Sequence, residues 1–160
     1  MYFHGTPWIC GSLTKDEISF PLCLDDTASR VLFDRPYISH QFPSRPETMA
    51  SLTEEQIRRA LLSLAFILLE LCFGSAILSN ELIENQTIGM QLDVATKWQQ
   101  KVYEEFGERY GDAVRGCIYP NFLRPVDSDN RNFCESSLQE GVYAVVFKPL
   151  DETLKFFVRD

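Results

Sequence analysis

The sequence holds little of what metal, redox and nucleic-acid sites are built from. It has two histidines, and its five cysteines are widely spaced, with no Cys-x-x-Cys pair among them. Lysine and arginine number 15 against 23 aspartates and glutamates, so the formal net charge is −8. A surface that binds nucleic acid draws its affinity from clustered Lys and Arg. We therefore expect no nucleic-acid partner, and free thiols in a reducing compartment.

The sequence also lacks a segment long enough to cross a membrane. Its longest apolar stretch, residues 60–74, is shorter than the roughly 20 residues that a spanning helix needs. Arg58, Arg59 and Glu70 flank or interrupt this stretch. The N-terminus has neither the basic region nor the long apolar core of a secretory signal. These features predict a cytoplasmic protein without a membrane partner.

What the chain does have is enough apolar material for one core. It contains 160 residues, of which 45% are hydrophobic and 12% aromatic, and this predicts a single domain over residues 1–160. The long apolar stretch is apolar on every side of a helix, so we expect other protein to enclose it. Ser51 or Thr53 is placed to cap this helix and Gly74 to end it. The result is a buried central helix over about residues 53–73.

The rest of the sequence predicts more helices around this one, with short strands or loops in the first 50 residues. Five of the eight prolines fall there, and proline removes a backbone donor and restricts the residue before it. The elements expected in this part are a helical turn at residues 14–17 and strands at 18–20 and 30–33. The later elements are helices at 89–106, 112–119 and 134–150, the last bent or ended by Pro149, and a polar loop at 124–132. The expected fold class is mainly α.

The central helix also carries a family resemblance. Ser63-Leu64, Leu68-Leu69-Glu70-Leu71 and Gly74 are similar to the pattern of the central helix in the C-terminal lobe of protein kinases. The catalytic kinase signatures are a glycine-rich loop, a lysine on a strand, His-Arg-Asp and Asp-Phe-Gly, and the sequence holds none of them. The aspartate that opens the kinase helix falls on Ala60, and its glycine falls on Ala65. The resemblance implies a degenerate, pseudokinase-type lobe without phosphotransferase chemistry.

The order of several segments extends this resemblance over most of the chain. Residues 4–9, 15–20 and 35–38, the buried helix, and then residues 110–118 and 145–150 follow an order that resembles a fungal kinase-like family of unknown function, domain of unknown function 7580. Members of that family are often fused behind domains linked to prion-type signalling and heterokaryon incompatibility. The resemblance implies a partial kinase-like C-terminal lobe, without the N-terminal lobe and the helix that precedes this region.

Few residues are candidates for chemistry, and each has an ordinary structural alternative. His4 and His40 lack the spacing of a zinc-ligand pair, and Cys10 with His40 lacks any local signature of a nucleophile. Asp25-Asp26 offers oxygen ligands for a hard cation, but adjacent acids in a loop are more often solvated. We therefore expect no catalytic residue, no metal site and no cofactor.

Two further features leave alternatives open. Glu70 is costly to bury in an apolar helix without a partner, so it either pairs with an arginine such as Arg115 or reaches water near the helix end. Trp8 and Trp98 either form a ligand-stacking surface or pack in the core, and core packing is favoured because large aromatic side chains dominate buried area.

The function that this resemblance implies is a non-catalytic, kinase-like interaction or regulatory module of a fungal signalling protein. The alternatives are an enzyme of unrecognised chemistry and a truncated gene product without an independent role. The partner is expected to be another protein or a second copy of the chain, bound through an apolar groove beside the central helix. The residues expected along this groove are Leu61, Leu64 and Leu68 with Tyr2, Phe3 and Trp8.

Overall fold

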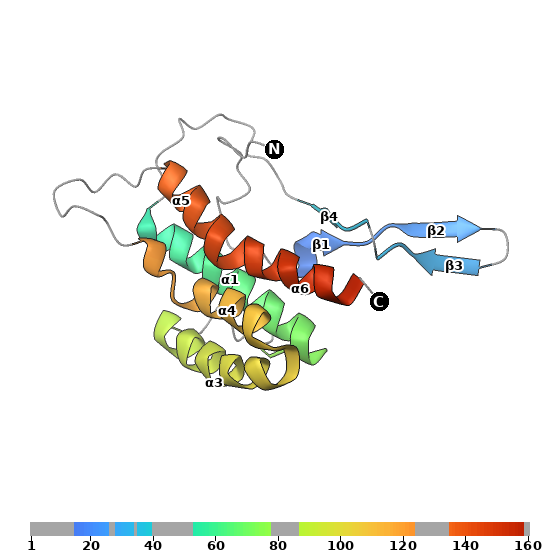
Figure 1. The fold of residues 1–160 in the computed structure, drawn as a ribbon. Coiled ribbons are helices and arrows are strands. Elements are labelled where there is room, and N and C mark those ends of the chain that lie inside the picture. The colour runs from blue at the N-terminus through green and yellow to red at the C-terminus, as the bar shows by residue number, and fades with distance from the viewer. Residues whose placement is uncertain are drawn as a thin grey trace, which may run out of the picture.

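The computed structural model is mainly helical, with a few short strands near its N-terminus (Figure 1). It describes residues 15–25, 28–33, 35–39, 53–77, 87–123 and 135–158. The predicted polar loop at 124–132 lies outside the described residues.

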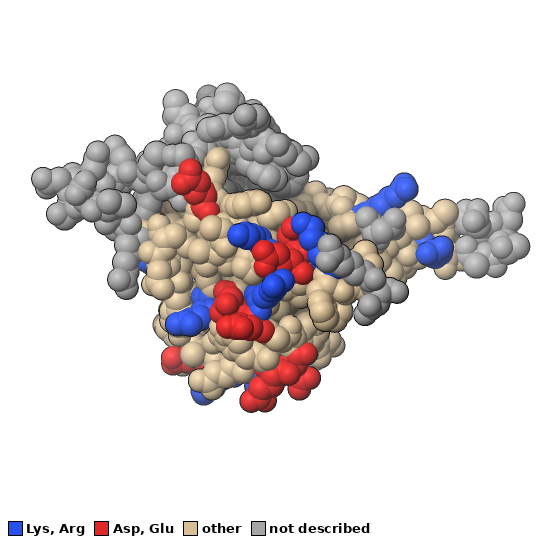
Figure 2. Space-filling model, in the orientation of Figure 1, with Lys and Arg blue, Asp and Glu red and all other residues tan. Residues whose placement is uncertain are grey.

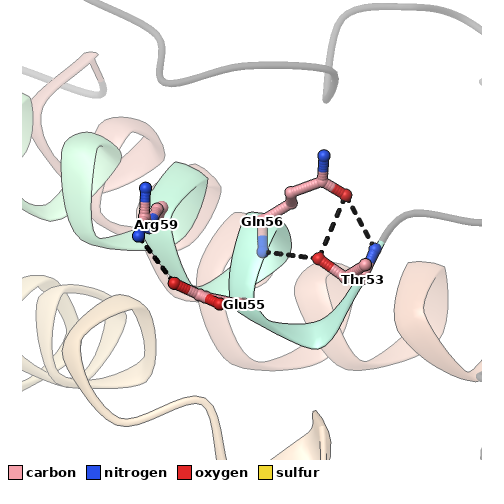
Figure 3. A network of polar contacts seen from close by, with 4 residues as sticks. All are labelled: Thr53, Glu55, Gln56 and Arg59. Atoms are coloured by element: carbon pink, nitrogen blue, oxygen red, sulfur yellow. Dashed lines mark hydrogen bonds and ion pairs between the residues drawn. The ribbon is translucent and has the colours of Figure 1, made fainter.

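The central helix α1 spans Glu54–Phe73 and confirms the helix predicted from the apolar stretch. Of the two candidate caps, Thr53 is the one that begins it. The hydroxyl of Thr53 accepts a hydrogen bond from the backbone N–H of Gln56, and the side-chain oxygen of Gln56 accepts one from the backbone N–H of Thr53 (Figure 3). Gly74 ends the helix at φ 61°, a left-handed conformation that glycine adopts without a side-chain penalty.

Helix α1 packs against other helices along its buried side. It packs against α3, which spans Ile88–Phe106, and against α4, which spans Glu108–Ile118. The buried residues of α1 are Ile57, Leu61, Leu62, Ala65, Phe66, Leu68 and Leu69. In the part of the chain that the structure describes, no helix is both long enough and apolar enough to cross a bilayer.

The helix predicted at residues 112–119 is α4, and it begins four residues earlier than expected. The sequence suggests that Gly107 and Gly111 both interrupt helical structure, but only Gly107, at φ 81°, lies between helices. Gly111 is inside α4 and buried, where an added Cβ would lie 2.7 Å from the ring of Tyr103 on α3. Gly111 is therefore a point of close helix packing, and not a break.

The last helix extends past Pro149, the proline expected to bend or end it. Helix α5, Glu135–Val142, continues through a π-helical turn at Tyr143–Phe147 into α6, Lys148–Val158. A proline ring clashes with the carbonyl four residues before it in a regular α-helix. Here the wider π turn, in which the N–H of Lys148 reaches the carbonyl of Tyr143, comes just before Pro149 and makes room for the ring. Of the two outcomes predicted for Pro149, bending or ending the helix, the ending is wrong for this reason.

The described part of the first 50 residues forms a β-ribbon that projects from the helical body (Figure 1). The expected turn is present as a 3₁₀ turn at Lys15–Glu17. The strands that follow are β1, Ile18–Ser19; β2, Leu22–Asp25; β3, Ala28–Val31; and β4, Tyr37–Ile38. Strand β1 pairs with β4 and β2 with β3, both antiparallel. The strands predicted at 18–20 and 30–33 are confirmed in part, whereas β2 and β4 were not predicted.

Candidate interaction surface

One face of the ribbon carries a cluster of apolar side chains. Leu22 of β2 lies directly opposite Val31 of β3, and the next residues on the same side of the two chains are Phe20 and Phe33. The antiparallel pairing of the two chains continues past β2 and β3 toward Phe20 and Phe33, because the N–H of Leu32 donates to the carbonyl of Pro21 at 2.9 Å. The rings of Phe20 and Phe33 are 5.5 Å apart. We call Phe20, Leu22, Val31 and Phe33 the ribbon face.

The ribbon face is open to solvent. The exposed fractions are 41% for Phe20, 54% for Leu22, 37% for Val31 and 74% for Phe33. On the opposite side of the ribbon Cys23 pairs with Arg30, and both are exposed. The ribbon is therefore amphipathic. A two-stranded ribbon of this kind is marginally stable in water unless something packs on its apolar face.

Glu70 connects the base of the ribbon to the helical body. Its side chain is 15% exposed, and one carboxylate oxygen lies 3.3 Å from the Nζ of Lys15, just before β1. The other oxygen accepts a hydrogen bond from the backbone N–H of Ile77 at 3.0 Å. Of the two alternatives left open for Glu70, the ion pair is present, but its partner is Lys15 and not an arginine. Arg115 is exposed and lies near the hydroxyl of Tyr103, which donates to Asp112 at 2.8 Å.

Of the residues expected along a groove beside α1, Leu61 and Leu68 are buried in the described part of the chain. Leu61 packs with Leu123 and Leu138, and Leu68 belongs to the core shared with α3 and α4. Leu64 is partly buried against the same core. These residues are covered by segments that are distant in the sequence, which helical periodicity alone does not reveal. The other residues expected in the groove, Tyr2, Phe3 and Trp8, lie outside the described residues.

The described cysteines are free thiols, as expected, and two of them have low reactivity. Burial raises the pKa of Cys117 to about 12, and burial together with the nearby charge of Glu105 raises that of Cys72 to about 11. The thiolate is the reactive form of cysteine, so both thiols are poor nucleophiles at neutral pH. Cys23, on the ribbon, is exposed.

The nearby Tyr110 is also held in its neutral form. Burial is the main cause that raises its pKa to about 12, and its hydroxyl donates to the carbonyl of Leu68 at 2.8 Å. This hydrogen bond joins α4 to α1, so the role of Tyr110 is to hold the two helices together.

Trp98 packs in the core, which confirms the favoured reading for this residue. Its ring meets that of Phe73 edge to face at 4.9 Å, and the Nζ of Lys101 lies 5.0 Å from its ring centroid. Trp8, the second residue of the proposed stacking surface, lies outside the described residues.

The residues weighed for metal binding or nucleophilic chemistry are mostly outside the described part of the chain. They are His4, Cys10, Asp26 and His40, while Asp25 is described only as the last residue of β2. Across residues 15–25, 28–33, 35–39, 53–77, 87–123 and 135–158, no three His, Cys, Asp or Glu side chains group in a way that would hold a metal ion.

A surface hollow at the start of α1 is lined by Thr53, Glu55, Gln56 and Arg59. Figure 3 shows that these side chains are engaged with one another: Thr53 with Gln56 in the helix cap, and Arg59 with Glu55 at 2.6 Å. These hydrogen bonds cap and stabilise the first turn of α1, so the polar side chains around the hollow serve the helix and do not indicate a ligand site.

The ribbon face was missed by the sequence prediction, although a signal for it exists. Apolar residues alternate at Phe20, Leu22 and Leu24, and again at Val31 and Phe33, with Asp25-Asp26 as a turn between the two runs. Pro21 interrupts the first run, and adjacent acids such as Asp25-Asp26 are more often solvated loop residues, so the alternation is weak as a local signal.

The described residues thus define a mainly helical domain with a projecting ribbon whose apolar face is open. The family model described as Domain of unknown function (DUF7580) matches residues 1–157, and the chain belongs to this family. Searches of the curated proteins and of the solved structures found no match.

Proposed function

We propose that this protein is a non-catalytic, kinase-like interaction or regulatory module of a fungal signalling protein, and that it binds a protein partner through the ribbon face. The observation that carries the proposal is the exposed set of Phe20, Leu22, Val31 and Phe33 on one side of the ribbon. Exposed apolar clusters of this kind mark sites of protein interaction.

The composition of the ribbon face supports a protein partner. Two phenylalanines lie against each other at its base, and large aromatic side chains are typical anchors at the centre of protein interfaces. The reverse side, with Cys23 and Arg30, is more polar and is suited to remain in solvent. A partner that covers the apolar side would supply the packing that two strands alone lack.

The kinase-like part of the proposal rests on the order of the segments that match the family, and its non-catalytic part on the missing kinase signatures. The state of the described thiols agrees with this. Cys117 is buried and Cys72 is partly buried, and the pKa of each thiol is raised, which favours a packing role over a nucleophilic one.

The experiment that tests the interaction compares the wild-type chain with Phe33→Asp as baits in an extract of the organism that makes the protein. Cys23→Asp is the matched control, because it places the same charge on the opposite side of the same ribbon. We expect at least one partner to be retained by wild type and Cys23→Asp and lost by Phe33→Asp. Identical sets of bound proteins for all three baits would refute a role for the ribbon face.

The non-catalytic part is tested with nucleotide. Kinases hold ATP and magnesium through the glycine-rich loop, the strand lysine and two metal-binding positions, none of which this sequence contains. We expect no change in melting temperature with millimolar ATP and magnesium. A shift of several degrees would contradict this part of the proposal and leave the ribbon face untouched.

A further inference from the structure

A second exposed apolar surface runs along the π turn and α6. Its side chains are Tyr143, Phe147, Leu150, Leu154 and Phe157, which follow one another at alternating steps of four and three residues. This spacing keeps side chains on one side of a helix and is the spacing along which paired helices interlock. The rings of Tyr143 and Phe147 stack at 5.5 Å, so neighbouring members of the series do lie side by side. We call these five residues the α6 stripe.

Most of the α6 stripe does not pack on the core of its own chain. Val146 is buried in the core, and the side chain of Val145 lies against Gly116 of α4. By contrast, four members of the stripe are exposed, at 58% for Tyr143, 56% for Phe147 and 61% for both Leu154 and Phe157. Only Leu150 is partly buried and touches the core. Helix α6 itself contains no buried residue.

The charges beside the stripe identify what would cover it. Lys148–Val158 holds Lys148 and Lys155 against Asp151 and Glu152, so this segment has no net charge although the chain has −8. Figure 2 shows acidic and basic side chains interspersed over the region that α6 occupies in Figure 1. A second copy of an acidic chain therefore meets no excess of like charge at this surface.

Asp151 and Lys155 add complementarity to this balance. They lie one turn apart on the same helix and form an ion pair there. If two copies of α6 lie antiparallel across a two-fold axis near Thr153, Asp151 of each copy comes opposite Lys155 of the other. Leu150 of one copy and Leu154 of the other face each other across an axis near Glu152, one residue away, so the apolar and the charged contacts call for nearly the same arrangement.

We propose that the α6 stripe pairs with the α6 stripe of a second copy, as an antiparallel helix pair that makes the chain a two-fold symmetric homodimer. Closed two-fold dimers are the commonest assembly of identical chains, and such an interface uses the same patch on both. The inference specifies one partner of the interaction module proposed above and rests on that proposal, but it uses a surface other than the ribbon face.

The first test is the mass of the full chain in solution, by light scattering after size exclusion and by sedimentation, up to about 100 μM. We expect a dimer for wild type, and for Leu154→Asp a dissociation constant at least about tenfold higher. Phe33→Asp, on the ribbon, is the matched control and should remain a dimer. Circular dichroism verifies that each variant is folded, which the exposure of Leu154 favours.

The second test changes only charges and therefore holds even if Leu154→Asp unfolds. Asp151→Lys alone and Lys155→Asp alone place like charges opposite each other in their own homodimers, and both should dissociate more readily. An equal mixture of the two restores opposite charges at both contacts, so it should form a heterodimer about as tight as wild type. An ion pair within one chain cannot give this rescue.

Three results would overturn the inference. A wild-type monomer at about 100 μM would mean that a second copy does not cover the stripe. A dimer that Leu154→Asp does not weaken, or that Phe33→Asp does weaken, would use another surface. Charge variants that fail to recover on mixing would exclude the antiparallel pairing. None of these results decides the proposal for the ribbon face, because the bait comparison of wild type with Phe33→Asp tests that proposal separately.

Discussion

The helical body and the β-ribbon of this protein are stabilised in different ways. In the body, Ala65, Leu69 and Val102 are fully buried, and α1 begins and ends with matched caps. In the ribbon, Phe33 is 74% exposed, and the strands have only each other for hydrogen bonds in the described residues. The body satisfies its apolar residues internally, whereas the ribbon leaves its apolar face for something else to cover.

This difference assigns stability to the helical body and partner binding to the ribbon. Surfaces that bind partners are commonly drawn from the less stable parts of a protein, because a fully satisfied surface gains little from another contact. The ribbon is such a part, attached to the body at the ion pair of Lys15 with Glu70. Four experiments would break or sharpen this contrast.

Thiol labelling should give the largest difference between the two regions. Cys23 lies exposed on the ribbon, whereas Cys117 is buried in α4 with its pKa raised from 9.0 to about 12. A rise of about three in the pKa alone lowers the thiolate fraction at neutral pH about 1000-fold. Peptide mapping after iodoacetamide treatment should therefore show Cys23 modified long before Cys117. Equal rates would mean that the body opens as readily as the ribbon.

Leu68→Ala should destabilise the body strongly. Leu68 is 7% exposed, and deleting a buried leucine side chain leaves a cavity that costs about 2 to 5 kcal/mol. The matched control is Leu71→Ala on the same helix, where the side chain is 69% exposed and the loss should stay below about 0.5 kcal/mol. Denaturant unfolding of both variants measures the contrast, and similar losses would contradict the burial of one side of α1.

The sequence predicts the body better than the ribbon because the signals of the body are local. The apolar run, Thr53 and Gly74 lie within one segment and define α1, and helical spacing alone places α3 within one residue of its observed start. The partner of Glu70 is 55 positions away, and no local pattern identifies it. The pairing that makes the ribbon face depends in the same way on which strands meet.

Two errors inside the body have a related cause. Gly111 and Pro149 look like breaks when each is judged by its own propensity. The close approach of Tyr103 explains the first, and the π turn at Tyr143–Phe147 accommodates the second. Tertiary packing and local helix geometry thus override the tendency of glycine and proline to end a helix.

Thr53→Ala should have a smaller effect, confined to the beginning of α1. Thr53 and Gln56 satisfy each other's backbone N–H groups, so removing the hydroxyl should cost about 1 kcal/mol. Thr87→Ala at the start of α3 is the comparison, since Thr87 accepts a hydrogen bond from the N–H of Met90 at 3.4 Å without the reciprocal bond. Thermal and denaturant melts should show the greater loss for Thr53→Ala. The reverse order would show that the reciprocal bond adds nothing.

The smallest effect is expected where the ribbon joins the body. Lys15 and Glu70 lie 3.3 Å apart with side-chain exposures of 38% and 15%, so solvent screens the pair, and Lys15→Ala should cost less than about 1 kcal/mol. A double-mutant cycle with Glu70→Gln isolates the interaction between the two side chains, because the amide of the substituted side chain keeps an oxygen for the N–H of Ile77. A coupling energy above about 2 kcal/mol would show that the ribbon unfolds together with the body. A value near zero would leave the ribbon as a separately mobile arm, able to close on a partner while the helical body keeps its own stability.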